Sequence, residues 1–118
     1  PNGGFSEICD YFASLSASLE HGDRRGCLAS QAAIDRAQDD PQVADIVAEI
    51  MADLRAAFAS AVAVGLARGE LRELPPDDLV EFLVGLQRAL ATMMRTATPA
   101  DEIQRYSQVS LAMLARPD

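Results

Sequence analysis

The residue with the most reactive chemistry in this sequence is Cys27, which follows Arg24, Arg25 and Gly26. At the first turn of a helix, the helix dipole and two guanidinium groups would lower the pKa of its thiol, as in a redox sensor. The alternative is a small apolar side chain that fills the corner between two helices, and we expect this structural role. Cys9 falls on an apolar helix face and is expected in the core.

Other catalytic or metal-binding groupings lack essential members. The one histidine, His21, stands beside Gly22 at an expected helix end and has no Glu three residues before it. A hydrolase triad needs a histidine oriented by a third group, and a metal site in a helical bundle needs Glu-x-x-His spacing. The glycines are isolated and form no phosphate-binding loop. We therefore expect no enzyme, no metal site and no cofactor.

Four polar side chains interrupt otherwise apolar helix faces, namely Ser30, Gln31, Arg55 and Gln87. A few polar groups in an apolar cavity fix the orientation of a small ligand. Buried polar groups are also often only structural, bonded within the protein or across a subunit contact. For each residue taken alone the structural role is favoured, and a shared ligand cavity is the sharper alternative.

The composition indicates one helical domain over residues 1–118. Of these residues, 49% are hydrophobic and 24% are charged, with four Phe, two Tyr and no Trp. Abundant Ala and Leu with few aromatic residues favour helices over sheets, and the length suits a single hydrophobic core.

The charge and the termini restrict the partners and the compartment. Eighteen acidic residues against ten arginines give a net charge of −8, which repels nucleic acid and anionic membranes. An uninterrupted apolar run of about 18 residues, a signal peptide and an initiator Met are all missing, so we expect part of a longer protein outside the membrane. Two cysteines form neither a disulfide framework nor a zinc spacing, which favours a reducing cytoplasm.

The longest predicted element is a helix over residues 40–69. Asp40 is the expected N-cap, Pro41 fits the first helical position, and Gly69 fits a left-handed C-cap. Apolar residues recur between them at helical spacing and cover more than a narrow seam, so neighbours must pack on two sides. At about 1.5 Å per residue this helix is roughly 40 Å long and spans a small domain.

Four further helices are predicted, over residues 5–20, 27–38, 76–96 and 99–115. The helix that begins at Pro76 carries Asp77 and Asp78 in its first turn and is apolar most of the way round. Thr98 is the expected N-cap of the last helix. The predicted fold class is therefore all-α, a bundle-like domain of five helices.

The order and the lengths of these predicted helices resemble those of the C-terminal regulatory domain of the TetR family of bacterial transcriptional regulators. The similar segments are GCL at 26–28, DP at 40–41, LRAAF at 54–58, ARGEL at 67–71, PDDL at 76–79 and FLVGLQ at 82–87. The resemblance covers about residues 5–114. It implies that a small hydrophobic effector enters the helical core and shifts the long helix, and that the last two helices form a four-helix bundle with a second copy. It also implies that DNA binds only through an N-terminal helix-turn-helix, which this sequence lacks.

Two sets of residues are predicted to carry these roles. The apolar stripe of the long helix is wider than one neighbour can cover, so we expect a ligand cavity beside it, lined by Phe12, Gln31, Ile34, Met51, Leu54, Arg55, Phe58, Leu83 and Gln87. Excess apolar surface on the last two helices predicts a homodimer. Its expected interface residues are Phe82, Gly85, Leu86, Ala89, Met93, Tyr106, Ser110 and Met113.

Three classes of function stay open. The leading hypothesis is the effector-binding and dimerisation domain of a TetR-like repressor. The alternative is a helical protein–protein interaction module without a small-molecule pocket, and a small helical enzyme that uses Cys27 comes third. A cavity of a few hundred Å³ favours the first over the second, and thiol reactivity separates the third.

Overall fold

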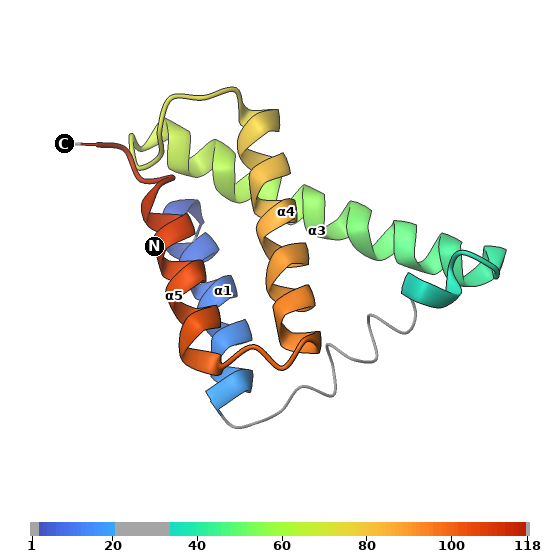
Figure 1. Cartoon of the computed structure of the whole chain (residues 1–118). Coiled ribbons are helices and arrows are strands. Elements are labelled where there is room, and N and C mark those ends of the chain that lie inside the picture. Colours follow the sequence, from blue (N-terminus) through green and yellow to red (C-terminus); the bar gives the residue numbers. More distant parts are fainter. Residues whose placement is uncertain (1–2, 21–33, 118) are drawn as a thin grey trace.

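The computed structural model describes residues 3–20 and 34–117, with side chains from residue 18 to residue 20 left out. Four long helices account for most of this part of the chain: α1 (Gly4–Glu20), α3 (Pro41–Ala67), α4 (Pro76–Arg95) and α5 (Ala100–Ala112). In Figure 1, α5 and α4 form one layer, and α1 and α3 lie behind them. The main contacts between helices join α1 to α3, α3 to α4, α4 to α5 and α5 back to α1. The expected all-α fold is confirmed.

Both ends of α3 are fixed by the residues that the sequence predicted. The Asp40 carboxylate accepts hydrogen bonds from the backbone N–H groups of Gln42 at 3.0 Å and Val43 at 3.4 Å. At the other end Gly69 has a φ of +72°. Its N–H donates to the Leu66 carbonyl at 3.1 Å, and the next N–H, of Glu70, reaches back to the carbonyl of Gly65 at 2.9 Å. This pair of bonds is the Schellman termination that a left-handed glycine permits.

The two C-terminal helices agree with the prediction in position, and the structure corrects the ends of α5. Pro99, not Thr98, is the N-cap residue, and no side chain caps this helix. The Thr98 hydroxyl instead lies 3.1 Å from the hydroxyl of Thr96. The helix ends at Ala112 rather than near Ala115, because Ala115 pairs in an antiparallel β-bridge with Leu71. A backbone in that extended conformation cannot also continue the helix.

The second predicted helix, residues 27–38, falls mostly outside the described residues. Its last part contains a helical turn over residues 34–36, followed by a hydrogen-bonded turn that leads to Asp40. Cys27 and Gln31 both lie in the undescribed part, so neither of their predicted roles is addressed by the structure.

The hydrophobic core lies where all four helices meet. Its aromatic centre consists of Phe12 from α1 and Phe58 from α3, whose rings stack with centroids 5.9 Å apart, and Tyr11 meets each ring edge-on. The aliphatic part of the core comes largely from α4, with Leu79, Val80, Leu83, Val84, Leu86, Leu90 and Met94. Because α4 contributes most of the aliphatic core residues, its sequence is strongly apolar.

The helix α3 is buried only over its C-terminal half, where Phe58, Ala61, Val62 and Gly65 enter the core. Its N-terminal half projects past α4 in Figure 1, and Ile46 and Ile50 there are exposed. Among the described helices, α3 alone is long and apolar enough to cross a membrane by length and composition. That criterion is weak evidence for a single helix, because core helices also meet it.

A junction of backbone and side-chain contacts closes the bundle at the end where α1 begins and α3 ends. The Phe5 N–H donates to Oε1 of Glu70 at 3.1 Å. A residue that follows α3 therefore provides the acceptor for one of the backbone N–H groups in the first turn of α1, which have no acceptor within their own helix. A Cβ atom at Gly4 would collide with that carboxylate oxygen. Leu71, buried in the core, packs so closely on Gly65 that a Cβ there would approach its Cδ1 to 2.8 Å.

We predict that Gly65→Ala lowers the free energy of unfolding by about 1–3 kcal/mol, the usual cost of inserting a methyl group into a packed core. Urea unfolding followed by circular dichroism measures this cost. In a Leu71→Val background the smaller neighbour leaves room for the methyl group, so the same change should cost less. Equal costs in both backgrounds would show that Gly65 and Leu71 do not pack this closely.

Candidate ligand site and dimer face

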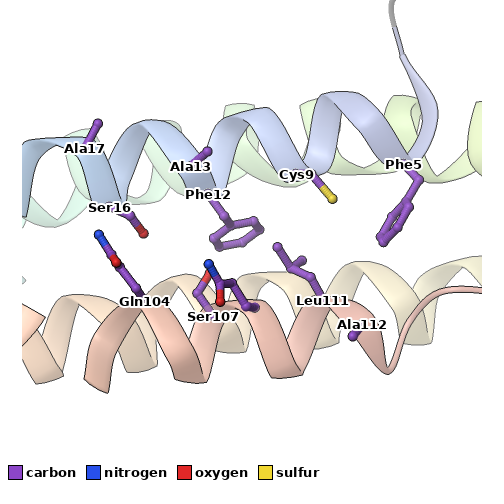
Figure 2. A pocket seen from close by; sticks show the side chains of 11 residues that line it. Phe5, Cys9, Phe12, Ala13, Ser16, Ala17, Gln104, Ser107, Leu111 and Ala112 are labelled. Atoms are coloured by element: carbon purple, nitrogen blue, oxygen red, sulfur yellow. The ribbon is translucent and has the colours of Figure 1, made fainter. Parts of the chain in front are cut away.

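A groove of about 480 Å³ runs between α1 and α5 (Figure 2). Residues of α1 on one side and of α5 on the other line it: Phe5, Cys9, Phe12, Ala13, Ser16, Ala17, Gln104, Ser107, Gln108, Leu111 and Ala112. The volume falls in the range of small-molecule sites, about 300–1,000 Å³. Of the residues predicted to bind a ligand, the groove includes Phe12.

The described residues that line the groove are uncharged, and its two ends differ chemically. Figure 2 shows Ser16 of α1 opposite Gln104 of α5 at one end, with Phe5, Cys9 and Leu111 toward the other. Burial, with a smaller contribution from the neighbouring Asp10 carboxylate, raises the pKa of the Cys9 thiol. Since the thiolate is the nucleophile of cysteine chemistry, this thiol remains protonated and unreactive near neutral pH. The arrangement can therefore bind a molecule but offers no activated group.

Ser107 occupies the middle of the groove and is the most buried polar residue there, with 4% of its surface exposed. Its hydroxyl makes no hydrogen bond with the described part of the chain. The sequence contained a signal for this position: Ser107 lies four residues from both Ile103 and Leu111, on the buried face of α5. Our sequence prediction overlooked it because it assigned α5 to the dimer interface.

The other predicted ligand residues lie outside this groove. Phe58 and Leu83 are buried in the core, and Met51 and Leu54 pack against it from α3. Gln87 is half-buried on α4, and Ile34 is exposed. The structure thus brings several of these side chains to the packed interface of α3 with its neighbours. The predicted cavity beside α3 stays a prediction.

Arg55, another predicted ligand residue, pairs with Glu81 and so links α3 to α4. The hydrogen bond that Arg55 donates holds the pKa of the Glu81 carboxyl below its usual value, with smaller contributions from the charges of Arg55 and Arg88. The same hydrogen bond raises the pKa of Arg55. Both side chains are accessible to solvent, so salt screens the pair and its contribution to stability is small.

The predicted dimer residues fall into two groups. Phe82 and Tyr106 are 43% and 45% exposed, and Met113 is 65% exposed, although all three are large and apolar or aromatic. A Cβ atom at Gly85 would have no neighbour within 4 Å, so the surface of α4 is open there. In contrast, Leu86 and Ser110 are buried within the protomer, and Ala89 and Met93 are half-buried.

One exposed residue of this face was missing from the prediction. Val109 on α5 is half exposed and lies three residues after Tyr106 and four before Met113, on the same helix face. Exposed apolar residues on both α4 and α5 leave apolar surface in contact with water, which is typical of an interaction site.

Within residues 3–20 and 34–117, no group of three or more His, Cys, Asp or Glu side chains could hold a metal ion.

Four packed helices, with a long α3 and two C-terminal helices that carry exposed apolar side chains, form an all-α domain in the described part of the chain. Residues 4–109 match the family described as "Tetracyclin repressor-like, C-terminal domain". The chain therefore belongs to this family, the C-terminal domains of TetR-like regulators. Such domains generally serve in effector binding and dimerisation. Searches of curated proteins and of solved structures each gave no match.

We predict that Glu81→Gln lowers the melting temperature at pH 7 in low salt, because it removes the charge that pairs with Arg55. Since the folded state lowers the pKa of Glu81, this stabilisation is present above the unfolded pKa of about 4.3 and disappears as the pH falls through the lower, folded value. The difference between the two proteins should therefore be smaller in acid, for example at pH 3, than at pH 7. Thermal melts at both pH values measure it.

The matched control is Glu49→Gln, which removes the same charge from an exposed position of α3 that forms no ion pair with the described residues. It should leave the melting temperature at pH 7 close to that of the wild type. If both variants melt alike at pH 7, the Arg55–Glu81 pair does not stabilise the fold.

Proposed function

We propose that this chain is the effector-binding and dimerisation domain of a TetR-like transcriptional repressor. The observation that carries the proposal is the set of exposed large apolar side chains on α4 and at α5, namely Phe82, Tyr106, Val109 and the C-cap residue Met113, in a chain of this family. The proposed partners are a second copy of the chain, a small hydrophobic effector and, through a separate N-terminal domain, operator DNA. The proposed compartment is the cytoplasm.

The proposed dimer packs α4 and α5 of one protomer against the same helices of its partner. A two-fold interface of this kind uses one surface twice, so each exposed apolar side chain is covered by the partner's copy of the face. Gly85 has no atom near its missing Cβ, which allows a close approach of the partner backbone. The buried Leu86 and Ser110 lie below this surface and would support it rather than meet the partner.

The packing offers a route from an effector to the dimer face. Phe12 on α1 stacks on Phe58 of α3, and Arg55, one turn earlier on α3, pairs with Glu81 beside Phe82 of α4. A ligand that moves α1 or α3 therefore changes contacts at the base of the interface. A ligand shifts a conformational equilibrium only if it binds one state more tightly than the other. In the proposed mechanism the ligand favours a state in which this displacement alters the spacing of the two DNA-binding domains.

We predict that Phe82→Glu separates the dimer, because the change places a charge in each of two symmetric positions at an apolar interface. Sedimentation velocity at micromolar concentrations measures the assembly. The matched control is Ile50→Glu, which introduces the same charge at an exposed apolar residue on the projecting half of α3. The control should remain dimeric. A wild-type protein that is monomeric at high micromolar concentration would refute the proposed function.

A further inference from the structure

We propose that the groove between α1 and α5 binds a neutral, elongated small molecule that combines an apolar body with one hydrogen-bonding group. This inference rests on the proposed function, since the ligand would be the effector of the domain. It differs from the cavity beside α3 that the sequence predicted, because the groove lies between α1 and α5 and no described residue of α3 lines it.

Ser107 gives the first argument for a ligand. A polar group that lines a pocket and has no hydrogen-bond partner within the protein is available to bond a ligand. Ser107 is 4% exposed and lines the groove, yet its hydroxyl has no hydrogen-bond partner in the described part of the chain. None of the described side-chain N or O atoms that are fully enclosed lacks a partner. The Ser107 oxygen therefore opens into the groove, where a bound molecule can reach it.

The lining determines the chemical class of the molecule. Apart from Ser107, its polar groups are the hydroxyl of Ser16 and the amides of Gln104 and Gln108, which are all neutral and can donate or accept hydrogen bonds. Among the described residues no charged side chain lines the groove, so an ionic group would lose its hydration without gaining a counter-charge from them. The net charge of −8 disfavours anions in addition.

The apolar end of the groove defines the rest of the ligand. Phe5, Phe12 and Leu111 offer an aromatic and aliphatic wall, and Ala13, Ala17 and Ala112 at the exposed rim are small enough to leave the entrance open. Figure 2 shows this wall extending along the two helices from the polar end. A molecule with an apolar body beside Phe12 and a polar group near Ser107 satisfies both ends. Because Phe12 also stacks on Phe58, such a ligand contacts α3 through a single side chain.

The test uses N-phenyl-1-naphthylamine, a neutral fluorescent probe with an apolar body and one N–H group. Its fluorescence is titrated with the wild-type domain and with four variants. Ser107→Ala removes only the hydroxyl in the groove, and Ser110→Ala is the matched control, a serine of the same helix that is buried to 6% exposure and does not line the groove. Ala112→Trp fills the groove from its rim, and Ala63→Trp places the same ring on exposed α3.

We expect saturable binding of one probe per protomer, with wild-type affinity in Ser110→Ala and Ala63→Trp. Ser107→Ala should weaken binding about fivefold, the value of one net hydrogen bond, and Ala112→Trp should abolish it. The anionic analogue 8-anilino-1-naphthalenesulfonate, which shares the apolar skeleton, should bind at least tenfold more weakly. Folding of each variant is checked by circular dichroism, and Ser107→Ala should be as stable as the wild type because no internal hydrogen bond is lost.

The inference is overturned if the probe does not bind, or if it binds with equal affinity to the wild type, Ser107→Ala and Ala112→Trp. Sedimentation of the same samples separates this result from a failure of the proposed function. If the protein is a dimer and the groove substitutions leave the affinity for the probe unchanged, only the proposed ligand site is contradicted. A monomer contradicts the proposed function, and the groove titration then still decides whether the site exists.

Discussion

The contact on which the rest of the structure depends is the one between the Glu70 carboxylate and the first turn of α1. Glu70 accepts the N–H of Phe5, and its own backbone carbonyl accepts the N–H of Arg116 from the C-terminal segment. One residue thereby joins the start of α1, the end of α3 and the chain that follows α5. The glycines at positions 4 and 65 make this possible, because side chains there would collide with Glu70 and Leu71. Helix ends carry unpaired backbone groups, and here a neighbouring segment satisfies them.

This junction ties the start of α1 to the end of α3, and α1 contacts both α3 and α5. On one side α1 packs tightly, and the rings of Tyr11, Phe12 and Phe58 fill the space. On the other side the small residues of α1 face the glutamines and Ser107 of α5, which leaves the groove. The helix α1 therefore has one face packed in the core and another that lines the groove, so a molecule bound in the groove would contact a helix that also belongs to the core.

The distribution of apolar surface explains how such a domain serves as a regulatory unit. The core uses the inner face of α4, while Phe82 on α4 and Tyr106, Val109 and Met113 at α5 remain exposed, and we propose that a partner covers them. The Arg55–Glu81 pair connects this layer to α3 at the surface, where screening keeps its contribution small. Modest contacts between helices suit a switch, because a ligand with a limited differential affinity can then change which arrangement is populated.

The sequence by itself determined the four long helices that the structure describes, their order and most of their ends. The caps of α3 follow from Asp40, Pro41 and Gly69, because capping depends on local backbone chemistry that the neighbouring residues carry. Only the tertiary structure decided where α5 ends, since the bridge between Leu71 and Ala115 joins segments far apart in the chain. The same holds for the site: helical spacing marked the buried face of Ser107, but which helix would face it depends on packing angles that no local pattern specifies.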